Sequence, residues 1–270
     1  MIRINKNNIK KKIFSLLQPS QIMDQKLIKI KKHKKNKIKY KIKIISAYNK
    51  DFKKIGDFSA KSIKKYAKKF KYDYQIYRIP NNFDRPLAWY KIKLLKELIK
   101  NEKYDAFFWI DADAFFLNKK IDINDCIDKI HDIYLVAHKI NLEKTSRFEN
   151  TQLSIKRINS GVMVVKKTKF VKNFLEKVWN NKKYINHFWW ENASIMDIIG
   201  HRAELTKNLF DNKDNKFFTK KIKYLNNVWN SIPSDGLESN LESHNPVIIH
   251  MAGRNIRERE NIIKKFNINI

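Results

Sequence analysis

Two aspartates that stand one residue apart, Asp111 and Asp113, directly follow an apolar and aromatic run, residues 106–110. A buried carboxylate is unfavourable unless another group pairs with it, so two of them beside a core-like run require a partner. If residues 106–110 form a buried strand, both acids lie where that strand ends, and the alternation of a strand turns them to the same side. The spacing therefore predicts a carboxylate pair that shares one cation. The alternative is a turn whose acids face solvent or cap a helix.

A histidine at the end of a second apolar run, His250, can complete such a site. Two carboxylates and one imidazole, with coordination positions left over, suit Mn²⁺ or Mg²⁺ that carries substrate phosphates, and the imidazole favours Mn²⁺. We therefore predict Asp111, Asp113 and His250 as metal ligands. A core histidine at a strand end is the alternative for His250 taken by itself.

Two basic side chains are candidates to neutralise phosphate oxygens, Lys91 as a point charge and Arg254 through its planar fork. Arg254 follows His250 closely, and two further arginines, Arg257 and Arg259, come after it. For Lys91 the alternative is a solvated helix face, because lysine is abundant throughout the chain.

Two further motifs carry groups that suit a sugar. Asn159, Ser160 and Gly161 precede a strand, where glycine permits a close approach of the backbone and the two polar side chains can bond sugar hydroxyls. The tryptophan pair 189–190, with Glu191 beside it, predicts a stacking surface next to a carboxylate. The alternatives are an ordinary turn for the first motif and core packing for the second.

The elements that must position these groups alternate between strands and helices in the first half of the ordered chain. Apolar and β-branched runs predict strands over 42–48, 74–79 and 106–110. Helical periodicity predicts one helix capped by Asp57 or Ser59 and another that opens at Pro86. This order predicts an α/β fold, with a mostly parallel central sheet flanked by helices, in which ligands bind at the carboxyl ends of the strands.

The second half of the chain is more mixed. Apolar runs predict strands over 133–138, 161–165 and 246–250. Helical patterns predict one helix that contains residues 170–179 and another that opens near residue 188 and ends near Gly200. Residues 139–157 read as a polar, loop-like stretch, and residues 203–232 as polar and aromatic with room for short strands.

Length and charge divide the chain into two parts. We predict a basic N-terminal extension over residues 1–40, which carries 13 Lys or Arg and one acid, and a single domain over residues 41–270. A like-charge block is typical of a solvated segment, and a weak peripheral contact with an anionic membrane is the alternative. No apolar run approaches the roughly 20 residues that span a bilayer, so we expect a cytoplasmic protein or one peripheral to a membrane.

The net charge of +31 raises the alternative of a basic nucleic-acid-binding protein. Only nine of the 58 basic residues are Arg, whereas proteins that read bases use arginine for bidentate contacts. The excess of lysine, mixed with Ile and Asn, is typical of an AT-rich coding sequence, and we expect no specific nucleic-acid partner. Cys126 is the single cysteine, which excludes a disulfide framework and a cysteine-based zinc site.

Taken in order, these motifs resemble the nucleotide-sugar glycosyltransferases of the GT-A fold, most closely family 34, the galactosyl-, mannosyl- and xylosyltransferases. Residues 109–114, Trp-Ile-Asp-Ala-Asp-Ala, are similar to the family's Trp-hydrophobic-Asp-x-Asp-Ala motif, and residues 250–253 match its closing His-x-x-Gly. The other similar blocks are residues 62–67 with 72–74, 89–91, 159–161, 174–179 and 190–193. The resemblance therefore extends from about Ile42 to Arg254.

The resemblance implies a metal-dependent, retaining transferase that moves a hexose or pentose from a UDP- or GDP-sugar to an acceptor hydroxyl of a glycan. It implies that Asp111 contacts the donor ribose or the metal, and that Asp113 and His250 are metal ligands. Ala47 and Tyr48 would line the nucleotide site, with the Tyr48 ring able to stack on the base.

The resemblance also implies that Asn159, Ser160 and Glu191 face the donor sugar and the acceptor, which makes Glu191 and Asn159 the catalytic candidates and adds Ser160 and Gly161 to the donor site. Asn192 departs from the family pattern, which has Gln there, and the membrane anchor common in the family is not visible. Because no residue is an unambiguous base, an inverting transferase or another GT-A family is the alternative.

Overall fold

The computed structural model describes residues 39–100, 103–141, 154–201, 214–233 and 242–265. The predicted N-terminal extension lies outside the described residues except for its last two positions, and so does the middle of the polar stretch predicted over 139–157. Within the described part of the chain, every helix is too short or too polar to span a bilayer.

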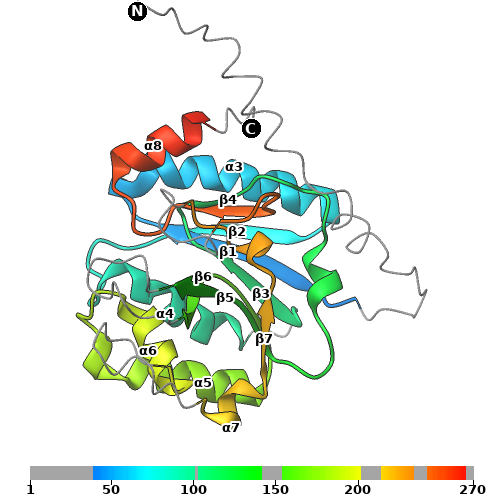
Figure 1. Ribbon diagram of the computed structural model, residues 1–270, viewed down its shortest axis with the longest axis vertical. Helices are drawn as coiled ribbons and strands as arrows, with labels where there is room; N and C mark the ends of the chain where they lie inside the picture. The colour runs from blue at the N-terminus through cyan, green and yellow to red at the C-terminus, as the bar shows by residue number, and fades with distance from the viewer. Residues whose placement is uncertain (1–38, 101–102, 142–153, 202–213, 234–241, 266–270) are drawn as a thin grey trace, which may run out of the picture. The chain divides into compact units, whose positions relative to one another are not determined.

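A six-stranded sheet forms the centre of the molecule (Figure 1). Its strands, in spatial order, are β2 (Asp73–Arg78), β1 (Ile42–Tyr48), β3 (Ala106–Ile110), β6 (Ser154–Lys166), β5 (Ile133–Asn141) and β7 (Ile222–Leu225). β1 is parallel to β2 and β3, and β5 is parallel to β7, whereas β6 is antiparallel to both of its neighbours. Five strands therefore share one direction, which confirms the predicted mostly parallel sheet.

The reversed strand β6 differs from the prediction in length. It begins at Ser154, seven residues before the predicted start at Gly161, and β5 extends to Asn141. Both ends of the stretch predicted as a loop over 139–157 are therefore strand, because β5 and β6 pair from Asn141 and Ser154 onward. Cross-strand pairing outweighs the polar composition of these residues.

A separate two-stranded sheet joins β4 (Ala114–Phe116) to β8 (Ile248–His250) in antiparallel register. The predicted last strand thus pairs beside the central sheet rather than in it. Ala114 lies opposite His250, and Ala114 directly follows Asp113. This pairing is what brings His250 to the two aspartates.

Helices cover both faces of the central sheet (Figure 1). They are α3 (Lys53–Phe70), α4 (Tyr90–Leu98), α5 (Lys169–Asn180), α6 (Trp190–Ile198), α7 (Lys216–Thr219) and α8 (Ile256–Lys265). The predicted cap of the first helix at Asp57 or Ser59 is wrong, because a 3-10 turn, η1 (Lys50–Phe52), starts the helical segment earlier. The side chain of Asn49 caps that turn by accepting a hydrogen bond from the backbone N of Phe52.

The core consists of two layers that the alternation of β3 separates. Phe107 and Trp109 pack with α4, α5 and α6, whereas Phe108 and Ile110 pack with α3 and the β4–β8 pair. All four side chains are buried. A strand covered on both faces reads as a continuous apolar run, and this is why β3 stands out in the sequence and why the acids that follow it are conspicuous.

Candidate active site

The two aspartates lie in a turn between β3 and β4 at the carboxyl end of the sheet. The backbone N of Asp111 donates to the carbonyl of Gly161 at 2.7 Å, and the N of Ala114 donates to the carbonyl of Asp111 at 2.9 Å. The N of Met251 donates to the carbonyl of Asp113 at 3.0 Å. The turn, rather than continued strand alternation, brings the carboxylates together, and the backbone bonds tie it to β6 and to the end of β8.

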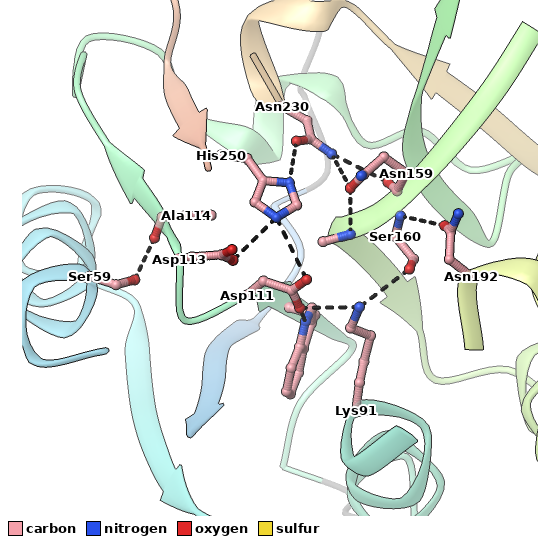
Figure 2. Close-up of polar contacts among 12 residues, drawn as sticks. Ser59, Lys91, Asp111, Asp113, Ala114, Asn159, Ser160, Asn192, Asn230 and His250 are labelled. Atoms are coloured by element: carbon pink, nitrogen blue, oxygen red, sulfur yellow. Dashed lines mark hydrogen bonds and ion pairs between the residues drawn. The ribbon is translucent and has the colours of Figure 1, made fainter. Parts of the chain in front are cut away.

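His250 faces both carboxylates (Figure 2). Its Nε2 lies 3.3 Å from Oδ1 of Asp113 and 3.8 Å from Oδ2 of Asp111. One ligand atom from each of the three residues falls within 4.8 Å of the other two. The predicted trio is therefore assembled, and its oxygen and nitrogen donors fit a divalent cation such as Mn²⁺.

Each carboxylate has its other oxygen held by a protein cation. Oδ1 of Asp111 lies 3.1 Å from Nζ of Lys91 and accepts from Nε1 of Trp109 at 2.5 Å. Oδ2 of Asp113 accepts from Nε and an Nη of Arg259 at 3.2 and 3.0 Å. Burial raises the pKa of Asp113, but His250 and Arg259 outweigh it and lower that pKa to about 2. In each acid one oxygen is thus fixed and the other faces His250.

Arg259 is a site residue that the sequence did not single out among three nearby arginines. It lies on α8, and its guanidinium is also 5.1 Å from the ring centroid of Phe52. Arg254, the predicted phosphate ligand, instead donates to the carbonyl of Pro233 at 2.9 Å and lies 4.0 Å from Glu258. Arg257 lies in the same first turn of α8, so the local sequence holds no signal that selects Arg259.

Lys91 lies inside the protein, so its alternative as a solvated helix face is excluded: only 2% of the residue is exposed. Its Nζ is 2.8 Å from Oε1 of Glu191 and 3.3 Å from Oγ of Ser160, in addition to its contact with Asp111. Burial lowers the pKa of Lys91, but the two carboxylates more than offset this effect and raise that pKa overall. Lys91 is therefore the charge that joins the buried Glu191 to Asp111, whose side chain is 29% exposed.

Glu191, on α6, has one satisfied oxygen and one open oxygen. Oε1 accepts from Lys91 and from Oγ of Ser160 at 3.1 Å, whereas the buried Oε2 has no hydrogen-bond partner among the residues that the structure describes. Burial raises the pKa of the Glu191 carboxyl, and Lys91 offsets only part of that effect. A buried oxygen with no partner is expected where a ligand supplies one.

The Asn159-Ser160-Gly161 motif lies in β6 against the trio, not in a turn. A Cβ on Gly161 would stand 2.1 Å from Cε1 of His250 and 2.8 Å from Oδ2 of Asp111. No side chain fits there, so glycine is what allows the ligands to close on β6. Oδ1 of Asn159 accepts from the backbone N of Gly161 at 2.9 Å.

Two residues that the sequence analysis did not select, Asn230 and His138, lie behind His250: Asn230 contacts His250, and His138 contacts Asn230. Oδ1 of Asn230 lies 2.9 Å from Nδ1 of His250, and the carbonyl of Asn230 lies 2.7 Å from Nε2 of His138 (Figure 2 shows Asn230). Nδ2 of Asn230 donates to Oδ1 and to the carbonyl of Asn159 at 3.0 and 3.3 Å. Asn230 follows η6 (Asn227–Trp229) in a polar segment, and its type alone gave no signal there.

Two cavities meet at the aspartates. The larger, about 590 Å³, is lined by the metal trio, by the Asn159–Gly161 motif, and by Glu191, Arg254 and Arg259, with Phe188 and Trp190 also on its wall. The smaller, about 360 Å³, is lined by Ala47, Tyr48 and Asn49 among others. Asp111, Asp113 and Trp190 line both, so a ligand that spans the cavities would pass the carboxylates.

Ala47 and Tyr48 are thus in the smaller cavity, as expected for a nucleotide site, but most of the Tyr48 ring is covered. Only 3% of the residue is exposed, and Cζ of Arg78 lies 4.0 Å from the ring centroid. A Cβ on Gly56 would be 2.5 Å from ring atoms of Tyr48. Stacking of a base on this ring stays a prediction, and it requires Arg78 or the backbone at Gly56 to move away from the ring.

Comparison with known proteins yields likeness in structure alone. No family model and no curated protein sequence matches the chain. A glycosyltransferase involved in the glycosylation of the major capsid of PBCV-1 aligns over 83% of this chain and 98% of its own, with a TM-score of 0.57 and 18% identity. The galactosyltransferase LgtC, in complex with donor and acceptor sugar analogs, aligns over 83% of this chain and 95% of its own, with a TM-score of 0.50 and 13% identity.

A third structure, the bifunctional glycosyltransferase WbbM, aligns over 85% of this chain and 50% of its own, with a TM-score of 0.52 and 14% identity. The chain has the GT-A fold. At these identities the likeness establishes the fold, and the chemistry has to be argued from the residues of this chain. In the fold described here, the carboxylate turn after β3 lines both cavities, and His250 at the end of β8 lines the larger one.

Proposed function

We propose that the chain is a metal-dependent glycosyltransferase that moves a hexose or pentose from a UDP- or GDP-sugar to a hydroxyl of a glycan. One observation carries the proposal. The trio Asp111, Asp113 and His250 lies where two cavities meet, and each acid presents one oxygen towards Nε2 of His250. An elongated donor with a diphosphate in its middle matches that arrangement.

Asp111, Asp113 and His250 are the residues that would hold the metal. Their donor set, two carboxylate oxygens and an imidazole nitrogen, suits Mn²⁺ and leaves coordination positions for phosphate oxygens. When bound, the metal supplies Lewis-acid stabilisation of the charge that develops on the leaving diphosphate. Arg254 and Arg259 line the same cavity and add positive charge near the place of the diphosphate.

Lys91 takes a different role from the predicted phosphate contact. It lines neither of the two cavities, and its ammonium is enclosed by Asp111, Glu191 and Ser160. We assign to Lys91 the orientation of both carboxylates, because its charge fixes Oδ1 of Asp111 and Oε1 of Glu191. The other oxygen of each acid then remains for a ligand.

Glu191 is the residue that we assign to the donor sugar. Glu191 lines the larger cavity, and its buried Oε2 has no partner among the described residues, which supports acceptance of a hydrogen bond from a hydroxyl of the donor sugar. The amide of Asn192, where the family pattern has Gln, is already used. It accepts from the backbone N of Ser160 at 3.0 Å and donates to the carbonyl of Ile158 at 3.3 Å. Glu191 is therefore the better placed polar group.

The proposed reaction breaks the bond between the anomeric carbon and the diphosphate oxygen and joins that carbon to the acceptor oxygen. The acceptor's proton leaves on the released nucleoside diphosphate. An inverting enzyme needs a general base for the acceptor. Among the residues that line the larger cavity, Glu191 is the one carboxylate outside the metal trio, and Lys91 neutralises it. His138 also lines this cavity, but its Nε2 is engaged by the carbonyl of Asn230 at 2.7 Å. This supports retention of configuration, in which no separate base is required.

The acceptor side of the site is aromatic. Phe188 is 80% exposed and Trp190 is 43% exposed, and both line the larger cavity. Trp190 has a φ of +44°, a conformation that is unfavourable for a bulky residue and that turns up at binding sites. Exposed aromatic faces suit the apolar faces of sugar rings, which supports a glycan as the acceptor.

The test is thermal unfolding with UDP and with GDP, each with and without Mn²⁺. We expect one nucleotide to raise the Tm when Mn²⁺ is present, because the nucleotide and the metal bind the folded state together. Asp113→Ala should abolish this shift, whereas Asp84→Ala, at an exposed acid, should keep it. If neither nucleotide shifts the Tm of the wild type with Mn²⁺, the proposal is wrong. The configuration of the product, read by NMR, then separates retention from inversion.

A further inference from the structure

We infer that Asn230 is a positioning residue that fixes His250 in the tautomer with its proton on Nδ1, so that the Nε2 lone pair faces Asp111 and Asp113. The backbone N–H of Gly161 fixes the direction of hydrogen bonds that run through the side-chain amides of Asn159 and Asn230 to His250. The consequence for metal binding rests on the proposed function, whereas the tautomer itself does not.

The first step is the orientation of Asn159. The backbone N–H of Gly161 can only donate, and it lies 2.9 Å from the side chain of Asn159. The atom that it meets must be the oxygen, Oδ1. Side-chain amides have two similar ends, and a fixed donor of this kind decides which end is which.

The second step is the orientation of Asn230. One end of its amide lies 3.0 Å from Oδ1 of Asn159 and 3.3 Å from the backbone carbonyl of Asn159. Both are acceptors, so the end of Asn230 that faces them must be the donor, Nδ2. The other end is then Oδ1, an acceptor. Asn230 is fully buried, and its carbonyl accepts from Nε2 of His138 at 2.7 Å, which holds the residue in place.

The third step is the imidazole of His250. Its Nδ1 lies 2.9 Å from Oδ1 of Asn230, an acceptor, so Nδ1 carries the proton. In the neutral ring Nε2 then has the lone pair, and Nε2 is the atom that lies 3.3 Å from Asp113 and 3.8 Å from Asp111. The hydrogen bonds from Gly161 through Asn159 and Asn230 to His250 thus present a metal-binding nitrogen to the two carboxylates. Figure 2 shows Asn159, Asn230 and His250 in this arrangement.

Through these hydrogen bonds the Asn159-Ser160-Gly161 motif also supports His250, in addition to its proposed contact with the donor sugar. Oδ1 of Asn159 already accepts two hydrogen bonds, from Gly161 and from Asn230. Partners behind a metal-ligating histidine set both the ring orientation and the basicity of its nitrogen, and their loss lowers metal affinity by roughly 10–100-fold. Asn159 and Asn230 together form such a support for His250.

The experiment compares Asn230→Asp with Asn230→Leu. An aspartate keeps an oxygen for Nδ1–H but loses the donor to Asn159, whereas leucine, of similar size, loses both. We expect both variants to be less stable than the wild type. We expect Mn²⁺ affinity, measured by calorimetry, to stay within a few-fold in Asn230→Asp and to fall roughly 10–100-fold in Asn230→Leu. Long-range ¹H–¹⁵N correlations, assigned with His250→Gln, should report the Nδ1–H tautomer in wild type and Asn230→Asp only.

The control removes another buried amide, Asn124, whose side chain bonds the backbone of Tyr40 at 3.0 and 2.8 Å, at the opposite end of the sheet. Asn124→Leu should lower stability and leave both the tautomer and Mn²⁺ affinity unchanged. An unchanged His250 tautomer in Asn230→Leu overturns the inference. Equal loss of Mn²⁺ affinity in both Asn230 variants also overturns it. A wild type that binds no Mn²⁺ would instead contradict the proposed function, and the tautomer of the metal-free protein would still decide the role of Asn230.

Discussion

Two polar clusters stand at opposite ends of the central sheet and use the same residue types. One is the candidate active site after β3. The other surrounds Asp128, which precedes β5, and includes Lys166, whose Nζ donates to the carbonyl of Asp128. The register of β3 against β6 separates them, because Ile110 pairs with Val162 at the site and Ala106 pairs with Lys166 at the other end.

The cluster around Asp128 is saturated with donors. Oδ1 of Asp128 accepts from the backbone N of Ile130 at 3.0 Å and of His131 at 2.9 Å, and Oδ2 of Asp128 lies 3.0 Å from Nζ of Lys223. Burial raises the pKa of Asp128, but the hydrogen bonds of His131 and Lys223 outweigh it and hold that pKa well below its ordinary value. Every oxygen of this carboxylate is used, and the cluster fastens the loop before β5.

In the candidate active site, by contrast, some donor and acceptor atoms have no protein partner at ordinary hydrogen-bond distance. Oε2 of Glu191 has no partner among the described residues, and Nε2 of His250 faces two carboxylate oxygens at distances longer than an ordinary hydrogen bond. The types of residue do not distinguish the two clusters. The number of open donor and acceptor positions does, and this is why we propose that binding takes place at one end of the sheet and not at the other.

The largest effect should come from Gly161→Ala, because the added methyl group would occupy the space now filled by His250 and Asp111. A methyl group there would stand 2.1 Å from Cε1 of His250, so the ring or β6 must move. We expect the Mn²⁺-dependent Tm shift by nucleotide to disappear and transfer to fall at least about 100-fold, since a 1 Å misplacement alone can have that effect. Val164→Ala, in the buried core of the same strand, should lower the Tm and keep the nucleotide shift. A normal shift in Gly161→Ala would refute the close packing.

A matched pair of lysines tests the difference in burial between the clusters. Lys91→Met leaves Glu191 and Asp111 without their shared cation, and breaking a buried pair lowers the free energy of unfolding by roughly 3–5 kcal/mol. The side chain of Lys223 is 38% exposed, so Lys223→Met should lower the free energy of unfolding by about 1 kcal/mol or less. Urea unfolding at pH 7 measures both. Equal losses would mean that the two clusters do not differ as described.

The sequence was sufficient for the parts of the site that strands present directly. Asp111 and Asp113 follow the most apolar strand, and His250 ends another, so residue type and position together predicted the trio. The mostly parallel sheet followed from the order of strands and helices. What could not be predicted is the pairing of β4 with β8, because two three-residue strands have no periodicity of their own.

The supporting residues escaped prediction for a related reason. Asn230 and Arg259 act through contacts between distant segments, 71 residues apart for Asn230 with Asn159 and 146 for Arg259 with Asp113. Nothing in their local sequence differs from the many other asparagines and basic residues of the chain. Lys91 was predicted as a phosphate contact, which stays untested, and its enclosure by Asp111 and Glu191 was not predicted because it depends on how distant segments pack.

The Asp128→Asn substitution tests the carboxylate at the centre of the saturated cluster. Because the folded pKa of Asp128 is lowered, its ionised form contributes stability above the unfolded value of about 3.9, and that contribution is lost as the pH falls towards the folded value. We expect Asp128→Asn to lower the free energy of unfolding by about 2 kcal/mol at pH 7, as for hydrogen bonds to a charged group, and the difference from wild type to shrink progressively below about pH 5. Urea unfolding across this pH range measures the difference, with the exposed Asp84→Asn as control. The activity of this variant should not change: below its Tm, sugar transfer should equal that of the wild type, since the saturated cluster lies at the other end of the sheet. A difference in the free energy of unfolding that stays constant with pH would show that the charge of Asp128 is not what stabilises the loop.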